Sequence, residues 1–311
     1  MSASKKRFVF FAALSISMLL CAGAAVAREY TFIVPIPKNL SMGSIAAILR
    51  NMDKTIENNT GFKINVIEYK YKYEEDPINY ILDKMNKNEA DFALIFTVEY
   101  LKYILTKKKT NAMPLFAISM FGKPTHQVCA YTRKSDNITS MEQLRGKTWG
   151  GTRTLFARYI LNSKGIDVPL NKFFKSMHFI PDENTAALFE ALLSKKIDTF
   201  TVTDYQVKMI INTDKRFKEI VSMNCVDFAH NWIVVYRKGM PEDDAGKLKN
   251  LFLNAEKSPE FAQFKFILSA IKGKFVGVDL KNLKQTRKLS ELCIKNGWFK
   301  EETTFLKANA K

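Results

Sequence analysis

The 311-residue chain is 47% hydrophobic and 25% charged, a composition that excludes the disordered and fibrous classes. Lysine and arginine outnumber aspartate and glutamate by 48 to 31, so the formal net charge is +17. Such an excess suits an acidic partner. The lysines occur in short, separated groups rather than in one stripe, however, so solubility explains them better. Because the features of the first 27 residues, described next, predict export, we expect no nucleic-acid partner.

The first 27 residues have the features of a secretory signal peptide. Basic residues at positions 5–7 precede an apolar run over residues 8–20, and Ala25-Val26-Ala27 forms a small-residue cleavage site. An uncleaved membrane anchor and a lipid on Cys21 are the alternatives, but Leu20 stands where lipid attachment sites usually carry a small residue. We therefore expect cleavage near Ala27 and a periplasmic protein.

The first half of the remaining chain alternates strand and helix signals. In order, they predict a strand over 30–34, a helix from 41 to a stop signal at 59–61, a strand over 63–69, a helix over 77–85 and a strand over 91–96. This order is typical of a parallel sheet covered on both faces. The alternation of Tyr69, Tyr71 and Tyr73 with lysines is interpreted as a half-exposed strand end, not a recognition surface.

The second half repeats this alternation. The predicted elements are a strand over 128–133, a short helix over 140–144, a strand over 147–149 ended by Gly150 and Gly151, a helix over 155–164, a strand over 179–180, a helix over 185–194 and a strand over 197–202. Ligands of such sheets bind beyond the carboxyl ends of the strands. Polar segments fall there after Val34 and at residues 97–100, 150–154, 182–185 and 203–205.

Three cysteines remain once Cys21 is removed: Cys129, Cys225 and Cys293. An odd number cannot all pair within one chain, so at most one disulfide is possible, and Cys129 with Cys225 is the pair to test. The histidines His126, His178 and His230 do not stand at ligand-like spacings from a cysteine, so no metal is expected.

Motifs for catalysis are missing. The chain has no G-x-S-x-G, P-loop or H-E-x-x-H motif, and no cysteine has an obvious partner histidine. We therefore expect neither an enzyme nor a cofactor.

Residues 137–151, NITSMEQLRGKTWGG, resemble the sledLkGk signature of periplasmic substrate-binding proteins. Together with NEADFALIFTVEY (88–100), ALLSKKID (191–198) and KGKFVGVD (272–279), they resemble the phosphate, phosphite and phosphonate-binding family of ABC importers. The resemblance implies an α/β, two-lobed periplasmic-binding-protein fold of type II, in which each lobe has a mixed, mostly parallel sheet flanked by helices. By the resemblance, residues 28–124 with 228–311 form the first lobe and 125–227 the second.

The resemblance and the strand ends together give a candidate ligand site. Its members are Thr97, Tyr100, Gly151, Thr152, Arg153, Thr154, Asn184, Thr185, Thr203, Asp204 and Tyr205. Unpaired N–H groups and the dipole at the start of the helix after Gly151 suit an anion, and Arg153 adds a guanidinium. The family's Ser-Thr-Ser-Gly run is shortened here, and Thr185 stands where the family has a histidine.

Six of the candidates also have a purely structural interpretation. Thr152, Arg153 and Thr154 could form a capped helix start, Asp204 and Tyr205 a cap and a packed ring, and Tyr100 a core aromatic. His230 and Asn231, near the second crossing between lobes, are interpreted as structural.

The function expected from these features is the extracytoplasmic solute-binding component of an ABC importer. Hinge closure would bury a small ligand, expected to be phosphonate- or phosphate-like, and the closed form would be recognised by a permease and ATPase. A monomer is expected. The alternatives are an exported enzyme on the same fold and a ligand-binding sensor for a membrane receptor.

Overall fold

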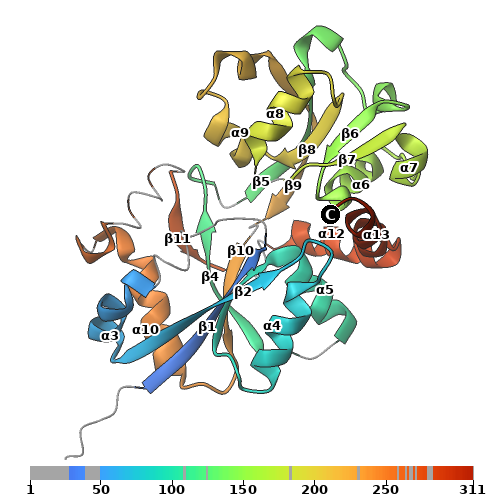
Figure 1. Ribbon diagram of the computed structural model, residues 1–311. Helices are drawn as coiled ribbons and strands as arrows, with labels where there is room; N and C mark the ends of the chain where they lie inside the picture. The colour runs from blue at the N-terminus through green and yellow to red at the C-terminus, as the bar shows by residue number, and fades with distance from the viewer. Residues whose placement is uncertain are drawn as a thin grey trace, which may run out of the picture.

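The computed structural model describes residues 28–38, 50–107, 110–123, 125–181, 184–229, 232–257, 259–262, 265, 269, 272–278 and 283–310. It has two α/β lobes, each built on one mixed sheet flanked by helices (Figure 1). The signal peptide, the start of the helix predicted from residue 41, His230 and Asn231 lie outside the described residues. No described helix combines the length and apolar character needed to cross a bilayer.

The first lobe contains a six-stranded sheet. In spatial order its strands are β11 (Lys274–Gly277), β4 (Ala112–Ser119), β10 (Trp232–Arg237), β3 (Phe92–Phe96), β1 (Arg28–Pro37) and β2 (Phe62–Tyr71). Its flanking helices are α3 (Asp53–Thr60), α4 (Pro77–Asn86), α5 (Thr97–Lys107) and α10 (Glu242–Leu253). Only β2, β1 and β3 pair in parallel, so the sheet is less parallel than the sequence predicts.

Helix α4 illustrates how local sequence sets these elements. The Asp76 carboxylate accepts hydrogen bonds from the N–H groups of Ile78 and Asn79, and Pro77 occupies the first turn, where its missing N–H costs nothing. The helix buries Ile81 and Leu82 completely. Helix α3 ends at Gly61, whose φ of 79° requires glycine, so the predicted stop signal is confirmed.

The second lobe contains a five-stranded sheet. In spatial order its strands are β7 (Ser176–Phe179), β6 (Thr148–Gly151), β8 (Thr199–Thr203), β5 (Thr125–Arg133) and β9 (Ile220–Ala229). Its helices are α6 (Thr154–Ser163), α7 (Leu170–Phe173), α8 (Thr185–Leu193) and α9 (Asp204–Ile210). Strand β6 includes the two glycines that were predicted to end it. Residue 150 is glycine because a Cβ there would lie 2.8 Å from Ile197 Cδ1.

Two neighbouring strand connections link the lobes, one from β4 to β5 and one from β9 back to β10. They start and end side by side, because β4 pairs with β10 in one sheet and β5 pairs with β9 in the other, both antiparallel. Two adjacent connections of this kind are typical of a hinge between lobes.

The C-terminal helices differ from the predicted division into lobes. Helix α12 (Lys284–Lys295) lies against α5, and Ser290 Oγ donates a hydrogen bond to the Val98 carbonyl, 3.0 Å away. Helix α13 (Trp298–Asn309) then packs on α6 of the second lobe, where Phe305 meets the Trp149 ring edge-on at 5.7 Å (Figure 1). The reason is that α13 presents buried aromatic residues, and the apolar surface they cover belongs to the second lobe.

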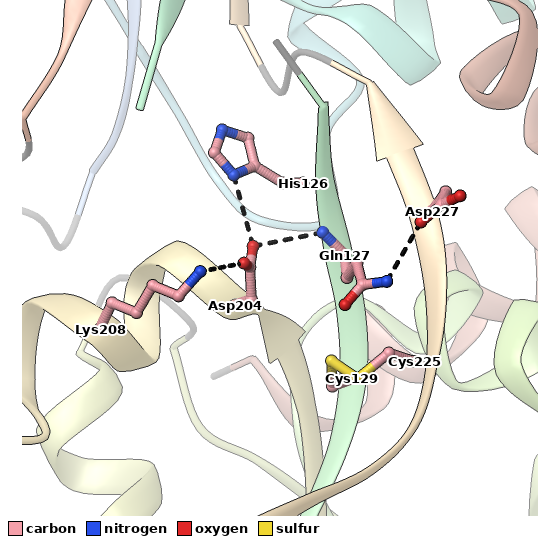
Figure 2. The surroundings of a disulfide bond; sticks show 7 residues. All are labelled: His126, Gln127, Cys129, Asp204, Lys208, Cys225 and Asp227. Carbon is pink, nitrogen blue, oxygen red and sulfur yellow. Dashed lines mark hydrogen bonds and ion pairs between the residues drawn. A yellow bond between two sulfur atoms is a disulfide. The ribbon is translucent and has the colours of Figure 1, made fainter. Parts of the chain in front are cut away.

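A disulfide joins β5 and β9 in the second lobe. Cys129 and Cys225 lie opposite each other, with Cα atoms 4.1 Å apart (Figure 2). Cys293 is a buried free thiol, and burial raises its pKa. The pair singled out from the sequence is therefore bonded.

We expect the double variant Cys129→Ala/Cys225→Ala to lose about 2–4 kcal/mol of unfolding free energy, because the bridge restricts the unfolded chain. Urea denaturation measures the loss. Cys293→Ala is the control, since it leaves the bridge intact and should not change sensitivity to reductant. If reductant leaves the midpoint of the parent protein unchanged, the bridge does not contribute to stability.

Candidate functional site

A cavity of about 290 Å³ lies between the lobes. The first lobe contributes the carboxyl ends of β1, β2 and β3, the start of α4, part of α5 and the start of β10. The second lobe contributes the starts of α6 and α9, and α13 closes one side. The cavity thus lies at the carboxyl ends of strands, as predicted, and its volume suits a small solute.

Arg153 connects the two lobes across this cavity. It is the N-cap residue of α6, and its Nη1 forms an ion pair with Glu99 of α5. The same nitrogen lies 3.4 Å from Oε1 of Glu302 in α13, and the guanidinium stands 4.3 Å above the Phe96 ring. Burial lowers the pKa of Arg153, but the two carboxylates outweigh burial and raise it, so the guanidinium stays charged.

Glu302 occupies the start of α6. Its Oε2 accepts a hydrogen bond from the Leu155 N–H at 3.1 Å and lies 3.5 Å from Thr154 Oγ1. The side chain is buried. Burial raises the pKa of Glu302 to about 7; Arg153 and the Leu155 N–H oppose the rise, and the Glu99 carboxylate adds to it.

Aromatic rings form much of the cavity wall. Phe96 and Trp232 stack with centroids 3.6 Å apart, and Tyr73 of the first lobe meets Phe179 of the second edge-on at 5.2 Å. Lys102 pairs with Asp76 at 2.7 Å, and its ammonium stands 4.7 Å from the centroid of the Phe299 ring. The cavity therefore combines aromatic faces with paired charges.

Three of the predicted site residues line the cavity: Thr152, Arg153 and Tyr205. Thr152 and Arg153 lie at the start of α6, as the sequence predicts. The expected anion position at this helix start, however, holds the carboxylate of Glu302 from the same chain.

Two predicted residues from α5 lie in the core of the first lobe instead. Thr97 is completely buried at the start of the helix. Tyr100 is 2% exposed, and its hydroxyl donates a hydrogen bond to the Ala112 carbonyl at 3.0 Å, so burial raises its pKa. Tyr100 is thus a core aromatic residue, the structural interpretation given above. Helical spacing turns it away from the face of α5 that carries Glu99 and Lys102 toward the cavity.

The other predicted residues support helix starts. Gly151 has φ 145°, which glycine adopts readily, and Thr154 lies behind the cavity beside Glu302. Asn184 Oδ1 accepts a hydrogen bond from the Ala187 N–H at 3.1 Å, and Thr185, the next residue, is buried. Thr203 Oγ1 donates to Gln206 Oε1 at 2.6 Å at the start of α9.

Asp204 fixes α9 to β5 rather than lining the cavity. Its carboxylate accepts hydrogen bonds from the Gln127 N–H at 3.2 Å and the Lys208 ammonium at 2.5 Å, and His126 Nδ1 lies 3.3 Å away (Figure 2). Burial raises the pKa of Asp204, but His126, Lys208 and the Gln127 N–H outweigh it and lower the pKa below its usual range. Asp204 therefore has the structural role that the sequence offered as the alternative, at the start of a helix.

Several lining residues were not predicted. Strand β2 ends at Tyr71, as the tyrosine alternation predicted, but Tyr71 and Tyr73 also line the cavity, which the sequence did not indicate. Glu99 lies in the predicted segment 97–100 and could have been found from its helical spacing to Lys102. Glu302 had no sequence signal, because its role depends on how α13 packs. Among the described residues, no group of three His, Cys, Asp or Glu side chains could hold a metal ion.

We expect Glu99→Gln to open the lobes of the solute-free protein, because the substitution removes the charge that Arg153 pairs with across the cavity. A charge-assisted bond contributes about 1.5–3 kcal/mol, enough to shift an open–closed equilibrium about tenfold. Small-angle X-ray scattering should give a larger radius of gyration for the variant. Glu190→Gln, which alters an exposed ion pair with Arg216, is the control. Equal radii for Glu99→Gln and the parent would contradict the role of the pair.

We expect Arg153→Met to lower the unfolding free energy by about 3 kcal/mol at pH 8, because it leaves buried carboxylates without their partner. The loss should be smaller at pH 5. Without the guanidinium, the pKa of Glu302 in the folded form rises further, so Glu302 is protonated and uncharged at pH 5. As the pH rises from the unfolded-state pKa through the folded-state pKa, the variant loses unfolding free energy, because the carboxyl must ionise while buried. Urea denaturation at both pH values provides the measurement. Arg216→Met on the surface should show no such difference, and equal losses for Arg153→Met at both pH values would contradict the coupling.

Comparison with known proteins places this chain in a family. Residues 52–279 match the family model described as "ABC transporter, phosphonate, periplasmic substrate-binding protein". No curated protein matches the sequence.

Solved structures share the fold at low sequence identity. PhnD1 from Prochlorococcus marinus, solved in complex with methylphosphonate, is 14% identical, with a TM-score of 0.63, over 86% of this chain and 98% of that one. A binding protein component of an ABC phosphonate transporter from Pseudomonas aeruginosa is 16% identical, with a TM-score of 0.58, over 91% and 97%. A Xanthomonas citri protein bound to chloride ion is 13% identical, with a TM-score of 0.63, over 86% and 98%.

The match covers most of both lobes and the strand connections between them, and the cavity residues outside it belong to β1 and α13. The chain belongs to the periplasmic substrate-binding proteins of phosphonate ABC transporters, the extracytoplasmic components that bind a small-molecule ligand for a permease and ATPase.

Proposed function

We propose that this protein closes around one small solute in the cavity between its lobes and that the closed form is recognised by the permease of an ABC importer. One observation carries the proposal: among the described residues, one cavity is lined by both lobes, and the two strand connections between the lobes lie side by side, as hinge connections do. Because the contacts of Arg153 and Tyr73 cross between lobes, the solute would be shielded from water in the closed form.

The proposal includes binding without turnover, a monomeric state and export with cleavage near Ala27. Binding without turnover is supported by the lack of recognisable catalytic motifs in the sequence. Cleavage of the signal peptide is supported by the apolar run before Ala25-Val26-Ala27. The two alternatives, an exported enzyme and a sensor, differ from this proposal in turnover and in partner.

The comparisons and the geometry of the cavity support different classes of ligand. The family description and the methylphosphonate in the Prochlorococcus marinus protein support a phosphonate-like anion at Gly151, Thr152, Arg153 and Thr154. Against it, the carboxylate of Glu302 lies at this helix start, and Arg153 is engaged with two carboxylates.

We expect at least one small solute to stabilise the protein and close its lobes without being converted. At about a hundredfold excess over its dissociation constant, a solute held only by the folded state adds about 2.7 kcal/mol to the unfolding free energy. A thermal-shift screen of anions, cations and zwitterions finds the solute, scattering measures closure, and NMR of the solute detects any product. Trp232→Ala in the cavity should abolish the shift, whereas Met209→Ala on the exposed face of α9 should retain it. Conversion of a stabilising solute would favour the enzyme instead.

A further inference from the structure

The start of α6 already binds an anion, and that anion belongs to the protein. A free oxyanion at this position would use the Leu155 N–H, the Thr154 hydroxyl and the Arg153 guanidinium. All three lie within 3.5 Å of the Glu302 carboxylate. Glu302 belongs to α13, outside the residues 52–279 that match the family model.

The charge of the cavity also opposes an anionic solute. Among the described residues that line it, carboxylates outnumber cations by five to two: Glu74, Glu75, Asp76, Glu99 and Glu302 against Lys102 and Arg153. Both cations are paired with carboxylates of this set. The chain as a whole has the opposite balance, 48 basic to 31 acidic residues, so composition does not explain the acidic lining.

The aromatic wall suits a cation. Two cations of the protein already lie over rings there, Lys102 over Phe299 and Arg153 over Phe96. A ring face attracts an ammonium group through its quadrupole, and the attraction strengthens when water is excluded. Two further rings belong to the same wall: Tyr73, next to Glu74 in the sequence, and Trp232, which stacks on Phe96.

Resting on the function proposed above, we infer that Glu302 is a built-in occupant of the anion position and that the cavity selects small solutes carrying a positively charged amine or ammonium group. Carboxylates of the lining neutralise the charge of the solute, among them Glu74, whose ion pair with Lys72 is long, at 4.0 Å. The aromatic rings enclose the apolar surface of the solute. An anion without an amine meets the carboxylates of the lining and loses its helix start to Glu302.

The experiment compares two sets of probes on the full protein by calorimetry and scattering. Tetramethylammonium, choline and 1,4-diaminobutane are the cations; methylphosphonate and inorganic phosphate are the anions, and sodium chloride controls for ionic strength. We expect saturable binding with closure for at least one organic cation and for neither anion.

Variants then separate the two halves of the inference. Glu74→Gln should weaken cation binding severalfold, because one neutralising charge is lost, without changing stability. Glu302→Ala should raise the affinity for methylphosphonate or phosphate about tenfold or more, the effect of freeing charge-assisted hydrogen bonds. Glu291→Ala on the exposed surface of α12 is the matched control and should change neither affinity.

The outcomes are distinguishable. If an anion binds the parent protein with closure and the organic cations do not, the inference is overturned while the solute-binding function stands. If no probe and no compound of the wider screen closes the lobes, both are overturned. If Glu302→Ala fails to fold, the comparison of cations with anions on the parent protein still decides the ligand class.

Discussion

The ion pairs of Arg153 determine how the parts of this molecule meet. One guanidinium, stacked on Phe96, is shared by Glu99 of the first lobe and Glu302 of the C-terminal helix. A half-buried charge beside two largely buried carboxylates is tolerated only with such partners. The position of the lobes, the docking of α13 and the polarity of the cavity therefore depend on the same few atoms.

Much of the fold followed from the sequence because its signals are local. Strands such as β3 are continuous apolar runs, and helix ends such as Gly61 require a backbone that few residues adopt. The glycines were predicted to end β6, and the strand does end at Gly151, but the need for glycine at residue 150 comes from Ile197, which is distant in the sequence and gave no signal. The placement of α13 failed for the same reason.

The candidate site was predictable by segment but not by side chain. The rule that ligands bind beyond strand ends selected residues 97–100 and 150–154, which contribute Glu99, Thr152 and Arg153 to the cavity, yet the rotation of α5 decides that Glu99, and not Tyr100, faces it. The start of α6 was recognised as a position for an anion, but its occupant is 147 residues away from Leu155 in the chain. Such long-range pairs leave no periodicity or spacing to detect.

The packing of α13 on α6 also has a consequence for how the protein acquires its structure. The second lobe is built from the middle of the chain, but Trp298 and Phe305, near the end of the described residues, complete its core. During synthesis these two rings emerge after every strand of both sheets. The lobes therefore cannot mature one after the other, and the unfinished middle segment must remain without its last apolar cover until the whole chain is present.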